Sequence, residues 1–104
     1  MKQHITFSMS ESERMHNLSS LIHDLLKKED VNFANRGCGR GILDSKPLDC
    51  EIYDLFQNEN QIGHFEFELK NGFYACELDL NLLSADKYKS IVDSIKREFP
   101  EVNF

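Results

Sequence analysis

The feature that most constrains the fold is the alternation of apolar and polar residues across positions 49–80. A period of two is typical of strands that bury one side and expose the other. The alternation is interrupted at Asn58–Asn60 and again at Asn71-Gly72. Asn-Gly is strongly favoured in two-residue hairpins, because both residues tolerate a positive φ. The segment therefore predicts three consecutive antiparallel strands.

One further strand and two helices flank this segment. Residues 2–9 also alternate and predict a first strand. Ser10 and Glu13 have the spacing of a capping box, so a helix is expected to begin there. Ser84 can cap a second helix, which Pro100 ends. Apolar residues recur at helical spacing in both: Met15, Leu18, Leu21, Ile22, Leu25 and Leu26 in the first, and Tyr88, Ile91, Val92, Ile95 and Phe99 in the second.

The segment 30–47 contains glycine at positions 37, 39 and 41 and ends at Pro47, which predicts an irregular connection that could include a short strand at Gly41–Leu43. The order of elements is then β-α-β-β-β-α. Two amphipathic helices and one alternating sheet share a core only if both helices pack on the same face of the sheet. With 104 residues, the chain is expected to form a single α+β domain over residues 1–104.

The charge balance disfavours nucleic acid as a ligand. Twelve Lys and Arg residues stand against eighteen Asp and Glu residues, and the net charge of −6 repels phosphates on average. Arg36 and Arg40 flank a glycine-rich loop, Gly37–Gly41, that lacks the G-K-[ST] ending of a phosphate-binding loop. No apolar run approaches the roughly 18 residues of a membrane span, and no apolar signal core follows Met1. We therefore expect a cytoplasmic protein without a membrane partner.

The residue types that carry chemistry show no recognisable spacing. Cys38, Cys50 and Cys76 are odd in number and form no C-x-x-C pair, which predicts free thiols in a reducing compartment. The four histidines are scattered, so neither a metal site nor a cofactor is predicted. No nucleophile, base and orienting group can be assembled. The sequence thus assigns no catalytic residue, and an enzyme is not expected.

Carboxylates are predicted to face one another across the sheet. If Asn71-Gly72 is the hairpin turn, Glu66 lies opposite Glu77 on the side away from the core. If Glu59-Asn60 is the preceding turn, Glu51 lies opposite Glu68. Like charges in such positions destabilise a sheet by up to about 1 kcal/mol per pair. The face is therefore either only solvated, or an anionic surface that binds a cationic partner.

This register also sorts the other residues of the strands. Cys50 and Ile52 fall on the core side, where Asp54 is an exception, and Leu55 falls on the outer side. The candidate partner-binding residues are Glu51, Tyr53, His64, Glu66, Glu68, Glu77 and Asp79.

A short acidic α+β chain with this face resembles the small immunity proteins that bacteria make against their own nuclease toxins. The residues that carry the resemblance are Glu51, Tyr53, Glu66, Glu68, Glu77 and Asp79. It implies a one-to-one inhibitory complex with a basic toxin domain, in which carboxylates replace nucleic-acid phosphates. A phage-encoded inhibitor of a host nuclease would share these features. The element order also resembles the RNA-binding β-α-β-β-β-α domains of ribosome-hibernation factors, but the helices carry few basic residues.

Overall fold

The computed structural model describes residues 3–36 and 50–102. Within these residues, the strands form one antiparallel sheet in the order β1-β5-β4-β3-β2. Together with the two helices, this confirms the predicted α+β class. The elements are β1 (His4–Met9), α1 (Ser12–Lys27), β2 (Asn32–Asn35), β3 (Cys50–Gln57), β4 (Asn60–Lys70), β5 (Phe73–Asp79) and α2 (Ala85–Glu98).

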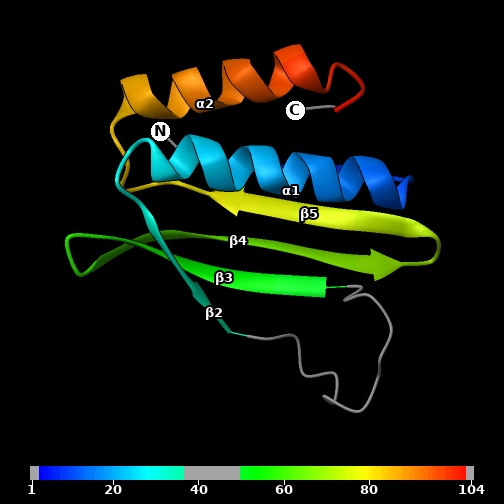
Figure 1. The fold of residues 1–104 in the computed structure, drawn as a ribbon, viewed down its shortest axis with the longest axis horizontal. Helices are drawn as coiled ribbons and strands as arrows, with labels where there is room; N and C mark the ends of the chain where they lie inside the picture. The colour runs from blue at the N-terminus through cyan, green and yellow to red at the C-terminus, as the bar shows by residue number, and fades with distance from the viewer. Residues whose placement is uncertain (1–2, 37–49, 103–104) are drawn as a thin grey trace.

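The core lies between the sheet and the two helices, which run side by side (Figure 1). Leu18 and Ile22 of α1 and Ile95 of α2 are completely buried, as are Phe65 and Leu78 of the sheet. The apolar stripes predicted for both helices are therefore confirmed. The two stripes are shielded from water because each helix packs its apolar face against the same side of the sheet.

The two helices begin differently. In α2, the Ser84 hydroxyl accepts a hydrogen bond from the backbone N–H of Lys87 at 3.4 Å, which confirms the predicted cap. The predicted capping box of α1 is wrong, because Glu11 occupies the N-cap position and makes no side-chain cap. The Ser12 hydroxyl instead accepts a hydrogen bond from the Tyr74 hydroxyl of β5 at 3.3 Å. A contact with the sheet thus occupies the first turn of α1.

The segment predicted as an irregular connection begins with a strand. β2 pairs antiparallel with β3, and Phe33 lies opposite Leu55. β2 is only four residues long, and polar residues occupy both of its ends, so it is too short for alternation to be recognised. The partner strand supplies the hydrogen bonds that hold it. The possible strand at Gly41–Leu43 lies outside the described residues.

The β4–β5 hairpin has the predicted register. Asn71 and Gly72 form its turn with φ of 52° and 84°, and Glu66 lies opposite Glu77. Local turn chemistry was sufficient here, because few residues other than Asn and Gly tolerate two consecutive positive φ angles.

The predicted β3–β4 register is wrong by one residue. Asn58 and Glu59 form the turn, with φ of 52° and 70°, and a bulge between Leu55 and Phe56 shifts the pairing again, so that Tyr53 lies opposite Phe65. A shift of one residue moves every side chain of a strand to the other face.

The shift exchanges the two faces of β3. Its helix-facing residues are now Glu51, Tyr53 and Leu55, and Leu55 is completely buried. Cys50 and Ile52 lie on the opposite face together with Asp54. Asp54, the carboxylate that the predicted register placed on the core side, therefore lies on the face away from the helices.

Candidate functional site

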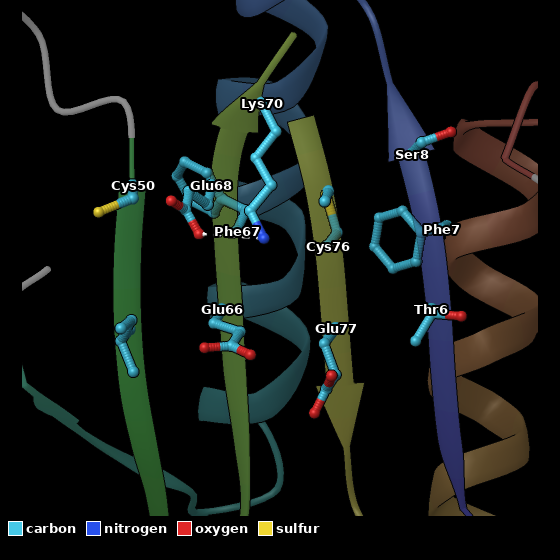
Figure 2. A pocket seen from close by; sticks show the side chains of 12 residues that line it. Thr6, Phe7, Ser8, Cys50, Glu66, Phe67, Glu68, Lys70, Cys76 and Glu77 are labelled. Atoms are coloured by element: carbon cyan, nitrogen blue, oxygen red, sulfur yellow. Dashed lines mark ion pairs between the residues drawn. The ribbon is translucent and has the colours of Figure 1, made fainter. Parts of the chain in front are cut away.

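The sheet face opposite the helices, which we call the open face, is the candidate functional site. Figure 2 looks onto it, with α1 and α2 behind the strands. No described helix or strand covers it, and it contains a depression of about 560 Å³. The side chains of the open face are His4, Thr6 and Ser8 of β1, Cys50, Ile52 and Asp54 of β3, His64, Glu66, Glu68 and Lys70 of β4, and Phe73, Ala75, Glu77 and Asp79 of β5.

The structure separates the predicted partner-binding residues into two groups. Glu51 and Tyr53 lie on the helix side of the sheet, because the β3 register differs from the predicted one. Sequence reasoning missed His4 and Asp54, which join the open face from β1 and β3. A carboxylate among core positions was a signal that the register of β3 needed correction. The predicted residues that share the open face are His64, Glu66, Glu68, Glu77 and Asp79.

Two histidines surround the carboxylate of Glu77. The Nε2 atom of His64 lies 2.5 Å from Oε1 of Glu77, and the Nε2 atom of His4 lies 3.3 Å from the same oxygen. The hydrogen bond with His64 is the largest cause that holds the pKa of the Glu77 carboxyl below its usual value, although burial opposes it. The two imidazoles therefore offset part of the repulsion between Glu77 and Glu66.

The other carboxylates of the open face differ in their partners. Glu68 forms an ion pair with Lys70 at 3.6 Å, and both side chains are more than half exposed, so the pair is worth about 1 kcal/mol or less. Asp54 lies 3.6 Å from the Nε atom of Arg36. Glu66, which is partly buried, has no hydrogen bond or ion pair with any described residue. Its charge is the least compensated at the centre of the open face.

Tyr53 belongs to an aromatic cluster on the helix side. The ring of His23 from α1 stacks on Phe33 at 4.0 Å and meets Tyr53 edge to face at 4.9 Å. The Tyr53 hydroxyl donates a hydrogen bond to Oε2 of Glu51 at 2.6 Å, and burial raises the pKa of this phenol above its usual value. Tyr53 and Glu51 thus serve packing between α1 and the sheet.

His23 makes stability depend on pH. Burial lowers the pKa of His23 below 6.5, with a smaller opposing effect from Glu51. Folding then favours the neutral ring, so its contribution is complete above about pH 6.5 and declines as the pH falls toward the lowered pKa. We expect His23→Phe, which retains stacking on Phe33, to lose less stability between pH 7.5 and 5.5 than the wild type.

Chemical denaturation at both pH values measures this difference. His16→Gln is the control, because His16 is exposed on α1 and contacts only the carbonyl of Ser12 in its own helix. A His23→Phe variant with the same pH dependence as the wild type would contradict the assignment.

The cysteines differ from the expected set of free thiols. Cys50 is disulfide-bonded, so the expectation is wrong for this residue, and Cys38 lies outside the described residues. Cys76 is free and buried on the helix side, 3.3 Å from the sulfur of Met15. Burial raises the pKa of its thiol to about 12. A thiol of this kind is not a nucleophile at neutral pH.

Comparison with protein-family models, curated proteins and solved structures finds no match to this chain. Neither described helix has the length and apolar character needed to cross a membrane.

Proposed function

We propose that this protein is an inhibitor that binds a cationic protein through its open face, in the manner of an immunity protein that neutralises a nuclease-type toxin. The observation that carries the proposal is Glu66, a partly buried carboxylate without a described partner, placed directly opposite Glu77. Repulsion between the two carboxylates destabilises the free protein, and a cationic group bound between them removes that repulsion.

The chemistry around Glu66 suits a protein partner. Ile52 lies beside it on β3 and Ala75 lies opposite Glu68 on β5, so apolar surface alternates with carboxylates across the depression (Figure 2). Phe73, which is 56% exposed, lies at the end of the same face. Apolar area with a few charges is typical of the centre of protein interfaces, and arginine pairs with carboxylates through two parallel hydrogen bonds.

The charge of the whole chain supports a basic partner. A net charge of −6 attracts a basic toxin domain over distances of about 10 Å at moderate salt and accelerates encounter. The same charge repels nucleic acid, so the ribosome-associated alternative has no support from the open face.

The test is Glu66→Gln, which removes the charge and keeps the size. We expect unchanged or slightly higher thermal stability, because the repulsion by Glu77 is removed. We expect the partner complex to weaken by about 2–5 kcal/mol if Glu66 pairs with a buried cation. Association should slow most at low ionic strength, where steering is strongest.

The partner is first captured from the source organism with the wild-type chain and then titrated against each variant. Asp93→Asn is the matched control, because it removes one negative charge from the exposed side of α2. Equal partner affinity of the two variants would argue against the open face as the interface. A Glu66→Gln variant that unfolds at lower temperature would assign Glu66 to the fold instead.

A further inference from the structure

Three neighbouring strands bring two imidazoles and two carboxylates together on the open face. β5 lies between β1 and β4 and carries Glu77, which faces Glu66 of β4. His4 of β1 and His64 of β4 both lie opposite Asp79, two residues further along β5. The side chains of both histidines reach back to Glu77 from opposite sides.

The donor atoms of three of these side chains are close enough to share one ion, and the fourth lies next to them. The candidate ligand atoms of His64, Glu66 and Glu77 all lie within 4.8 Å of one another, and the Nε2 atom of His4 lies 3.3 Å from Oε1 of Glu77. Ligands at about 2.0–2.2 Å from a tetrahedral zinc ion are separated by roughly 3.3–3.6 Å. The hydrogen bond of 2.5 Å between His64 and Glu77 must lengthen, so that the ion replaces the proton between them. His4, which lies outside that group of three, must turn toward the ion to become the fourth ligand.

We propose that His4, His64, Glu66 and Glu77 form a binding site for one divalent transition-metal ion of the zinc type. The site shares Glu66 and Glu77 with the proposed partner-binding surface, but it goes beyond the proposed function, because zinc binding requires no partner and is measured on the chain alone. It also differs from the expectation of no metal site, which followed from the scattered positions of the histidines in the sequence.

The donor set selects the class of metal. Two imidazole nitrogens with carboxylate oxygens suit Zn²⁺ and its neighbours in the first transition row, whereas Mg²⁺ and Ca²⁺ prefer oxygen ligands alone. Cys76 cannot compete, since it is buried on the other side of the sheet. The side chains of His4, His64 and Glu77 are about one-third exposed, at 30%, 30% and 34%, so an ion can enter from solvent.

Asp79 provides an outer partner for one ligand. Its Oδ2 atom lies 3.9 Å from Nδ1 of His64, on the side of the ring away from Glu77. A carboxylate in this position accepts the second N–H of a metal-bound imidazole and orients the ring. The backbone N–H of Asn81 holds Asp79 through a hydrogen bond of 2.9 Å, and His64 must turn toward Asp79 to shorten the distance of 3.9 Å to that of a hydrogen bond.

The experiment is a titration of the tag-free full chain with ZnCl₂ by calorimetry at pH 7.5. We expect one ion per chain, a rise in the unfolding temperature with added zinc, and reversal of that rise by a chelator. His64→Gln should weaken binding by at least about tenfold, since loss of a ligand costs no less than loss of an outer partner. His4→Gln and Glu66→Gln should each weaken it as well.

His16→Gln is the control for zinc held by a surface histidine, because it removes an exposed imidazole from α1. It should bind zinc as the wild type does. Circular dichroism verifies that each variant is folded, and CoCl₂ adds a visible absorption whose intensity reports four-coordinate geometry. The absence of saturable one-to-one binding would overturn the site, as would equal zinc affinity of the folded His64→Gln and His16→Gln variants.

Discussion

Replacing Gly63 with alanine is expected to lower the free energy of unfolding by about 3 kcal/mol, the upper end of the range for overpacked sites. A Cβ atom on this residue of β4 would lie 1.8 Å from the carbonyl oxygen of Asp79 and 2.7 Å from its carbonyl carbon. Both are backbone atoms and cannot rotate away. The end of β5 would have to separate from β4, which would also displace Asp79 from His64 on the open face. Denaturation with urea measures the loss.

Gly72→Ala is the matched control. Gly72 has a positive φ of 84°, but nothing lies within 4 Å of the position of an added Cβ. The substitution should therefore cost only the backbone preference of about 1 kcal/mol. If Gly63→Ala were no more destabilising than Gly72→Ala, the close approach of β4 to the end of β5 would be contradicted.

Phe65→Ala is expected to cost about 3–5 kcal/mol, as is usual for truncation of a buried aromatic residue. Phe65 is completely buried on the helix side of β4. Its ring lies 6.0 Å from that of Phe67 and 6.4 Å from those of Tyr53 and His23. Removing the ring leaves a cavity beneath the strand that carries His64 and Glu66. Thermal or chemical unfolding should therefore show a large decrease in the free energy of unfolding.

Phe73→Ala removes the same ring from an exposed position. Phe73 is 56% exposed on β5, so its loss should change stability by only about 0.5 kcal/mol. The difference in stability loss between the two variants distinguishes a ring buried on the helix side of the sheet from a ring exposed on the open face. Similar losses of stability for both would show that Phe65 does not lie in the core.

The hairpin of β4 and β5 and the faces of both helices were predictable from the sequence. Asn71-Gly72 determines the hairpin register through backbone conformations that few other residue pairs adopt. The stripes of α1 and α2 repeat at helical spacing over several turns, and such repetition survives in any packing that covers them. Glu66 and Glu77 were therefore placed correctly opposite each other.

The register of β3 was decided by the tertiary structure. Asn58 and Glu59 form a turn without glycine, so the sequence did not distinguish it from a turn one residue later. With the bulge between Leu55 and Phe56, Leu55 lies in the core and Asp54 lies on the open face. Burial of Leu55 against the helices selects this arrangement, because a slip by one residue would bury the carboxylate instead.

The cluster around Glu77 also depended on the tertiary structure. His4 and His64 are 60 positions apart in the chain and meet only because β5 lies between β1 and β4 in the sheet. Strand order follows from which edges pair during folding, and periodicity within each strand carries no information about it. The sequence alone therefore determined both helices and every described strand except β2, and the pairing of β1 with β5 determined which ionisable side chains share the open face.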